Sequence, residues 1–341
     1  MSVEDTTGAI VLSPAVSAAT RTRKTFFAGT HRSCSPAETF ERLRPCFPEI
    51  GLTRVADITG LDRVGVPVTI AIRPNSPTLV TCSGKGLSLE AARTSGAAEA
   101  IELFCAERID AHEVLRASYR DLAERFAMIP DDRLQFSRKP LFRDDWPYEW
   151  LLAWDIATHA PVPVPRSSVE MVPDDGRVRD LCCFQATSNG LASGNNLPEA
   201  VTAGLLEVIE RDAAACWALS VRAGRAVFPR VRLDTIDDPA CLHLLEQMQR
   251  SGISVMLFDI TVDTAVAVYM AYIGDDEFDR LSIFKGYGAH LDPAVAISRA
   301  LTEALQGRLV FIAGSRDDMS ERHFWQARQL GTRAAFQALR R

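Results

Sequence analysis

The sequence lacks any apolar run of the roughly 18 residues that a transmembrane helix needs, because charged residues interrupt its hydrophobic stretches. It also lacks the order of a signal peptide, since residues 1–24 carry acidic residues near their start and no charged stretch followed by an apolar one. An excess of basic residues is absent too. The formal net charge is −6, which argues against general binding to nucleic acid or to an anionic membrane. We therefore expect a cytoplasmic protein with no membrane and no nucleic-acid partner.

Paired cysteines are also missing. The 8 cysteines are scattered along the chain and none forms a CxxC pair, so a zinc site or a disulfide framework is not expected and the thiols are predicted to be reduced. The adjacent Cys182 and Cys183 lie in "DLCCFQAT", which has the character of a strand. We interpret these two as small core residues rather than as a redox pair.

The composition is that of a globular protein with a large core, since 47% of the 341 residues are hydrophobic and 24% are charged. Residues 1–20 are expected to be disordered and residues 21–341 to form a single domain. Predicted helices and strands are interspersed, so the fold class is α/β or α+β. Helices are expected within 35–47, 113–127 and 242–252, and strands within 65–74, 77–86, 253–261 and 265–275. The Pro-rich segment 160–180 is predicted to be a connection or surface loop.

One pattern occurs three times, in residues 84–102, 193–210 and 286–306. The copies align on Glu99, Glu207 and Glu303. An alanine then falls seven residues earlier in each copy (Ala92, Ala200, Ala296), and a second long polar residue falls three later (Glu102, Glu210, Gln306). A glycine-bearing loop precedes every copy.

This spacing places each polar pair on one face of a helix, while apolar neighbours indicate that the helices are largely buried. Single pairs of this kind are usually solvated, but three copies in register favour a function. Buried carboxylates that converge repel one another unless a cation compensates them, and hard oxygen ligands suit Mg²⁺. Glycine loops that open helices offer N–H groups to phosphates. The GxxxxGK[ST] spacing of a Walker loop is absent, so we expect a nucleotide site built from carboxylate helices and metal.

The same segments resemble the three characteristic blocks of YcaO-domain proteins. The blocks are "GKGLSLEAARTSGAAEAIELFCAE", "SNGLASGNNLPEAVTAGLLEVIERDA" and "GAHLDPAVAISRALTEALQGRLVFIAGSRDD". "TFFAGTHR" and "GLTRVADITGLDRVGVPVTIAIRP" resemble the amino-terminal part of that domain. The similarity covers roughly residues 20 to 320, and its style is that of the YcaO proteins that work with a TfuA partner.

The resemblance implies a YcaO-like fold, with repeated glycine loop–helix units around a buried site for ATP and Mg²⁺. It implies an enzyme that phosphorylates the oxygen of a peptide backbone amide, so that a nucleophile attacks the activated carbon. A Cys, Ser or Thr side chain would give an azoline ring, and an external sulfur source would give a thioamide. The implied metal ligands are Glu99, Glu102, Glu207, Glu210 and Glu303. The implied nucleotide-binding residues are Lys24, Ser95, Asn189, Asn195, Arg211 and Gln306, with Arg23, Arg32, Lys85 and Arg73 as further basic candidates. His31 and His290 lie in matching motifs, with a ligand role and a structural role both open.

Two departures from the family pattern bear on activity. Leu103 stands where the first helix often has an arginine, and the chain ends about 20 residues after "SRDD", so the domain is expected to be short at its carboxyl-terminal end. We expect a peptide substrate, a TfuA-like or leader-peptide-binding partner protein, and a homodimer as a plausible assembly. Thioamide formation is preferred over azoline formation. The alternatives are a module that binds nucleotide or leader peptide without turnover, and an ATP-dependent ligase that acts on something other than a peptide.

Overall fold

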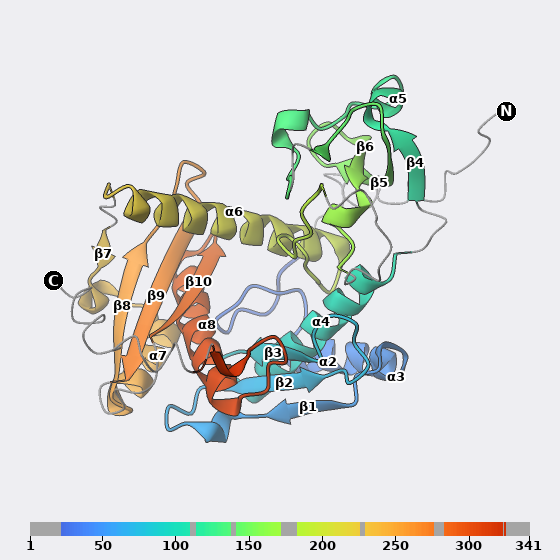
Figure 1. Cartoon of the computed structure of the whole chain (residues 1–341). Helices are drawn as coiled ribbons and strands as arrows, with labels where there is room; N and C mark the ends of the chain where they lie inside the picture. Colours follow the sequence, from blue (N-terminus) through green and yellow to red (C-terminus); the bar gives the residue numbers. More distant parts are fainter. Residues whose placement is uncertain are drawn as a thin grey trace.

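The computed structural model describes residues 22–109, 114–137, 141–171, 183–225, 229–275, 283–322 and 324. Within these residues the strands form three antiparallel sheets, and the long helices pack on two of them (Figure 1). This arrangement is the α+β class. None of the described helices is both long and apolar enough to cross a membrane. The segment predicted to be disordered, residues 1–20, lies outside the described residues, as does Cys182.

The helices are α2 (Pro36–Leu43), α3 (Phe47–Ile50), α4 (Leu89–Glu107), α5 (Tyr119–Ala123), α6 (Leu197–Arg222), α7 (Pro239–Arg250) and α8 (Pro293–Ala313). The strands are β1 (Arg54–Asp57), β2 (Val68–Ile72), β3 (Thr81–Lys85), β4 (Val114–Ser118), β5 (Pro147–Asp155), β6 (Ala160–Pro165), β7 (Arg230–Val231), β8 (Ile253–Asp259), β9 (Ala267–Asp275) and β10 (Phe284–His290). Short 3₁₀ turns occupy Arg44–Cys46, Thr59–Leu61, Asp131–Arg133, Arg166–Ser168 and Leu233–Thr235.

The first sheet has the order β1-β2-β3 and carries α4 on one face. Ala97, Ala100 and Leu103 of α4 pack against Ala71 and Cys82 of the sheet. Small side chains on both surfaces allow the helix and the sheet to lie close together. The strands predicted within 65–74 and 77–86 are confirmed as β2 and β3.

The second sheet has the order β10-β9-β8-β7 and lies between two layers of helices. Strand β9 shows the alternation that such a position requires. Val268 and Met270 belong to the cluster that α6 covers, whereas Ala271 and Ile273 belong to the cluster that α7 and α8 cover. The predicted strands within 253–261 and 265–275 are confirmed, and so is the helix predicted within 242–252.

The third sheet has the order β4-β5-β6 and was not predicted. The helix expected over 113–127 is wrong in its first half, where the chain forms β4. Ser118 explains the boundary, because its backbone is extended and its side chain accepts the N–H of Asp121 as the N-cap of α5. The helix therefore begins only after Ser118. Cys183 lies buried beside Phe184 and Trp150 in the core that packs on this third sheet, as a small core residue should.

The prediction of a loop over 160–180 is also wrong at its start, where β6 pairs with β5. Pro161, Pro163 and Pro165 occupy every second position of this outer strand. Because the three prolines occupy alternate positions, their backbone nitrogens, which carry no hydrogen, all point away from β5. The residues between the prolines form the hydrogen bonds to β5. A proline-rich sequence can form an edge strand in this way.

Residues 22–35 form a loop in the space between α4, α6 and α8 (Figure 1). A bridge between Phe26 and Arg32 closes the loop on itself. Ser33 donates to Glu199 of α6, and His31 lies 3.5 Å from Asp292 at the start of α8. This loop therefore contacts the first turn of α6 and the start of α8.

Candidate functional site

Three capped helices carry the glutamates that the repeated pattern singled out. Ser88, Asn196 and Asp292 are the N-caps of α4, α6 and α8, and each side chain accepts a backbone N–H of the first turn. Glu99, Glu207 and Glu303 then occupy the middle of their helices. The predicted helices of the three copies are confirmed.

Some glycines of the pattern lie in the predicted loops, as Gly86 does before α4 and Gly194 before α6, but three others have a different role. We expected them in loops that present N–H groups to phosphates, but Gly84 lies in β3, and Gly286 and Gly288 lie in β10. An added Cβ at Gly84 would stand 2.0 Å from the carbonyl oxygen of Ala92, and one at Gly288 would stand 2.1 Å from that of Ala296. Gly84 and Gly288 therefore let β3 and β10 contact the helices that follow them, at the recurring alanines Ala92 and Ala296.

The close strand–helix contact brings backbone N–H groups to the glutamates. The N–H of Ala289 donates to Glu210 at 3.2 Å, and the N–H of Tyr287 donates to Glu303 at 3.2 Å. In the loop before α6, the N–H of Ser193 donates to Glu102 at 2.7 Å. Three of the five predicted metal ligands are thus oriented by backbone groups.

The five glutamates influence one another electrostatically. Burial raises the pKa of Glu99 to about 7, and the nearby charges of Glu102 and Glu303 act in the same direction. Burial also raises the pKa of Glu102, with a contribution from Glu207, and that of Glu210, with a contribution from Glu303. Carboxylates from α4, α6 and α8 therefore form one electrostatically linked cluster, in which ionisation of Glu99, Glu102 and Glu210 is disfavoured.

Two cations, Lys85 and Arg211, compensate part of this charge. The Nζ atom of Lys85 lies 2.9 Å from Glu303 and donates to the side-chain oxygen of Gln306 at 3.2 Å. The guanidinium of Arg211 lies 3.5 Å from Glu207 and 3.6 Å from Glu210. Gln306 also donates to the backbone oxygen of Ser83. Lys85, a further candidate in the sequence, thus lies among the predicted ligands.

The donor set suits a hard divalent cation, because it consists of carboxylates, and a bound cation would favour the ionised forms of Glu99, Glu102 and Glu210, whose pKa values are raised. The carboxylates do not yet surround a common point. Among the described residues no three His, Cys, Asp or Glu side chains are arranged to hold a metal ion. Instead their oxygens contact backbone N–H groups, Lys85 and Arg211.

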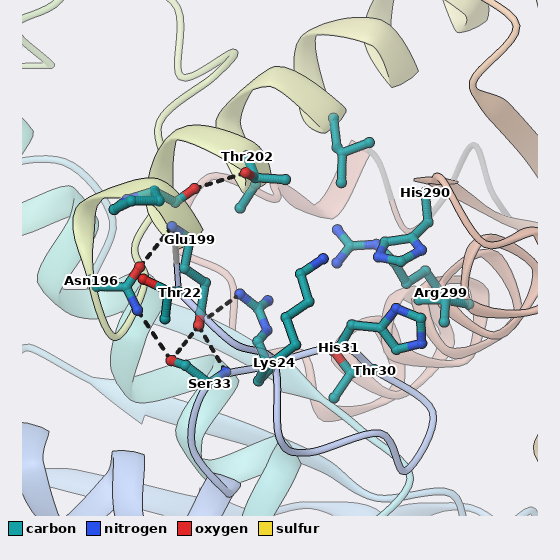
Figure 2. Close-up of a pocket in the computed structure, with 15 residues that line it drawn as sticks. Thr22, Lys24, Thr30, His31, Ser33, Asn196, Glu199, Thr202, His290 and Arg299 are labelled. Carbon is teal, nitrogen blue, oxygen red and sulfur yellow. Dashed lines mark hydrogen bonds and ion pairs between the residues drawn. The ribbon is translucent and has the colours of Figure 1, made fainter. Parts of the chain in front are cut away.

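A pocket opens beside this cluster, between the loop of residues 22–35 and the starts of α6 and α8 (Figure 2). Lys24, His31, Asn196, Glu199 and Arg299 are among the residues that line it. Arg32 and Arg299 both line the pocket. The charge of Arg32 opposes the rise in the pKa of Glu102, and the charge of Arg299 opposes the rise in the pKa of Glu210. The pocket and the glutamate cluster are therefore within electrostatic reach of each other.

Glu199 anchors one side of the pocket, and sequence reasoning missed it. It accepts hydrogen bonds from the N–H and the hydroxyl of Ser33 and from the side chains of Arg32 and Asn195. Burial alone would raise the pKa of Glu199, but the bonds from Ser33 and the charge of Arg32 outweigh it and lower the pKa. Its position eight residues before Glu207, on the same helix, was the available signal.

Arg299 was missed as well. It lies four residues before Glu303 on α8, a spacing that shares a helix face, and its Nε is buried without a hydrogen-bond partner in the structure. A buried guanidinium N–H with no partner that faces a pocket is a candidate contact for an anion.

Some of the remaining predicted residues line or support the pocket, and others lie outside it. Lys24 lines the pocket, and Asn195 accepts from Thr39 and donates to Glu199, so it acts through that carboxylate. Ser95 is half-buried on α4, four residues before Glu99, whereas Asn189 is exposed and outside the pocket lining. Arg73 does not join the site, because it forms a buried ion pair with Glu107 at the end of α4.

A comparison with known families identifies the origin of this architecture. Residues 83–340 match the family model described as YcaO cyclodehydratase, ATP- and Mg²⁺-binding. The cofactors predicted from the sequence, ATP and Mg²⁺, are those that describe this family. The match spans the segments that contain all five glutamates and Arg299.

Individual proteins give the same result. An uncharacterised protein from the tfuA 3′ region of Rhizobium leguminosarum bv. trifolii is 38% identical over 300 residues, which is 85% of this chain and 70% of that protein. The YcaO protein of Methanopyrus kandleri, solved with AMPPCP and Mg²⁺, is 25% identical with a TM-score of 0.65, over 86% of this chain and 72% of the other. A heterocyclase in complex with substrate and cofactor shares the fold, with a TM-score of 0.72 at 23% identity, over 90% of this chain and 44% of the other. The chain belongs to the YcaO family, and its relative from the tfuA region supports the TfuA-associated type.

Proposed function

We propose that this chain uses ATP and Mg²⁺ to modify backbone amides of a peptide, forming thioamides together with a TfuA-like partner. The observation that carries the proposal is the cluster of five glutamates on α4, α6 and α8 beside a pocket that contains Lys24 and Arg299. Carboxylates for metal and cations for phosphate are the two components that phosphoryl transfer requires.

Each component has a proposed task. Glu99, Glu102, Glu207, Glu210 and Glu303 would hold Mg²⁺, which neutralises charge on the phosphates of ATP. Lys24, Arg211 and Gln306 would contact phosphate or nucleotide, and so would Lys85, a further candidate from the sequence, and Arg299. Ser95, Asn189 and Asn195 stay predicted nucleotide contacts. The carboxylates would exchange their present N–H and Lys85 partners for metal.

The proposed reaction begins when the amide oxygen attacks the γ-phosphorus of ATP and releases ADP. A sulfur nucleophile then attacks the amide carbon and phosphate departs. The name of the Rhizobium relative, which places it beside tfuA, supports the thioamide outcome and a TfuA-like partner. We place the reaction in the cytoplasm, where the scattered cysteines would stay reduced.

Calorimetric titration of ATP into the purified chain, with and without Mg²⁺, tests the site. Binding that depends on Mg²⁺ is expected, with a loss of at least about tenfold in affinity for Glu207→Gln, since a metal ligand is removed. Glu246→Gln is the matched control, because Glu246 lies on the exposed face of α7. Equal binding by wild type and Glu207→Gln would show that the metal assignment is wrong.

Mass spectrometry of a randomised synthetic peptide pool, incubated with the chain, the TfuA protein from the gene region of the Rhizobium relative, ATP, Mg²⁺ and sodium sulfide, tests the chemistry. Replacement of oxygen by sulfur is the expected product. Loss of water would instead indicate azoline formation, the second candidate, which the cyclodehydratase description of the family favours. ATP binding without release of ADP or AMP would indicate a binding module, and ATP consumption with no peptide product would indicate another ligase.

A further inference from the structure

Two histidines and an aspartate lie together on the side of the pocket that faces α8. The rings of His31 and His290 meet edge to face with centroids 5.1 Å apart, and the Nε2 atom of His31 lies 3.5 Å from a carboxylate oxygen of Asp292. Figure 2 shows both rings beside Arg299 and the tip of Lys24, on the opposite side from Glu199 and Asn196. The two sides of the pocket thus carry different chemistry.

The two histidines are not equivalent. The Nδ1 atom of His290 accepts the backbone N–H of Asp292 at 2.9 Å, which fixes its neutral tautomer with the proton on Nε2. Burial lowers the pKa of His290 to about 4, and the charges of His31, Lys24 and Arg299 add to this effect while Asp292 opposes it. His290 is therefore a poor proton acceptor near pH 7. Its neutral ring is held in place and packs against the ring of His31.

Asp292 is itself held in place. One of its carboxylate oxygens accepts the N–H of Ala294 at the start of α8, and the other faces His31. An imidazole placed between a fixed carboxylate and an open pocket is the arrangement that general acid–base catalysis uses. The distance of 3.5 Å is longer than a hydrogen bond, as is common before substrate binds.

Exposed apolar side chains flank this group. Phe27, whose ring lies 5.2 Å from that of His31, is 59% exposed, and Leu291, between His290 and Asp292 in the chain, is 71% exposed. Two exposed apolar side chains next to His31 and His290, which line the pocket, offer contact area to a substrate that approaches from this side. A peptide that lies across Phe27 and Leu291 would reach His31 first, and the phosphate contacts Lys24 and Arg299 next.

We propose that His31, oriented by Asp292, is the proton-transfer group for attack on the activated amide, with the peptide entering over Phe27 and Leu291. The inference rests on the proposed function. Hydrosulfide adds its sulfur to the amide carbon, the bond from that carbon to the phosphorylated oxygen breaks, and phosphate leaves. His31 takes the proton that the sulfur carried and returns it to the departing phosphate. The amide, hydrosulfide and ATP thus become thioamide, ADP and hydrogen phosphate, with no net oxidation.

The test compares His31→Gln and His31→Ala with wild type on the same peptide pool with the same TfuA protein, sodium sulfide, ATP and Mg²⁺. Both variants should lose about 100-fold or more in thioamide formation, the range of general acid–base catalysis, while their affinity for ATP stays within about threefold. Added imidazole should restore about a tenth of the rate to His31→Ala, whose missing ring leaves room for it, but not to His31→Gln. Asp292→Asn, which keeps the N-cap, should lose an intermediate amount. His243→Ala, on the exposed face of α7, is the matched control.

Three results would overturn the inference: variants that keep the wild-type rate, a loss of rate that accompanies a loss of ATP affinity, or a loss that imidazole does not relieve. The last two would make His31 a nucleotide contact or a structural residue. If the wild-type chain modifies no peptide, the assay shows this before any variant is made. That outcome overturns the proposed function, and this inference with it.

Discussion

Glu303 and Glu99 show how two glutamates in one cluster reach opposite protonation behaviour. Burial would raise the pKa of Glu303, but the ammonium of Lys85 and the N–H of Tyr287 outweigh burial and lower it. Glu99 forms no ion pair with any described cation, and burial raises its pKa to about 7. Binding of a metal ion would therefore change the protonation of Glu99 more than that of Glu303, because of these two only Glu99 has a proton to lose near neutral pH.

This difference predicts proton release on ligand binding. At pH 6 Glu99 is mostly protonated, so binding of Mg²⁺ with AMPPCP should release more protons than at pH 8, where the carboxyl is already ionised. Calorimetry in two buffers of different ionisation enthalpy measures the release, and Glu99→Gln should lose the difference. Equal release at both pH values in wild type would contradict the prediction. Without ligand, the same raised pKa makes the fold less stable as the pH rises from the ordinary glutamate range to about 7, because the folded chain holds a proton that the unfolded chain has lost.

At the scale of elements, the contact between β10 and α8 depends on glycine. A Cβ added at Gly288 would meet the backbone oxygen of Ala296, which cannot move without the helix, so Gly288→Ala should lower the free energy of unfolding by about 1–3 kcal/mol or more. Gly307 lies within α8 with nothing near its missing Cβ, so Gly307→Ala should raise stability by about 1 kcal/mol. Urea denaturation of both variants checks the opposite signs. A Gly288→Ala variant as stable as wild type would mean that the strand and helix are not in close contact.

The elements also show what the sequence could reveal. The repeated spacing and the apolar neighbours predicted α4, α6 and α8 and placed the five glutamates on them, because both are local signals. Glu199, Arg299 and the pair of His31 with Asp292 depend on contacts between segments far apart in the chain. The glycines were assigned to loops for the same reason, since only the packed structure shows that Gly288 lies against Ala296. The prolines of β6 misled through composition, which does not show which edge of a strand faces solvent.

At the scale of the whole molecule, a buried charge network joins the two sheets that enclose the site. Arg308 of α8 contacts Asp62, which follows the first strand β1, and Asp275 at the end of β9. Arg63 contacts the same Asp275 and the backbone oxygen of Ser251. The side chains of Arg308, Asp62 and Asp275 are all at most 3% exposed. The helix that carries Glu303 is thus fixed to both sheets by one guanidinium.

Removal of that guanidinium should affect the fold and the site together. Arg308→Met removes the guanidinium beside buried Asp62 and leaves Asp275 with Arg63, and it should lower the free energy of unfolding by about 3–5 kcal/mol, the cost of breaking a buried pair from one side. Arg250→Met, which breaks an exposed pair with Glu246 on α7, should change it by less than about 0.5 kcal/mol. Urea unfolding, monitored with and without Mg²⁺ and AMPPCP, measures both effects. Ligand should recover part of the loss in Arg308→Met, because ligand binds only the folded arrangement of the helices. If Arg308→Met were as stable as Arg250→Met, the two sheets would be held together by their apolar contacts alone, and α8 would owe its position to the glycine contacts of β10.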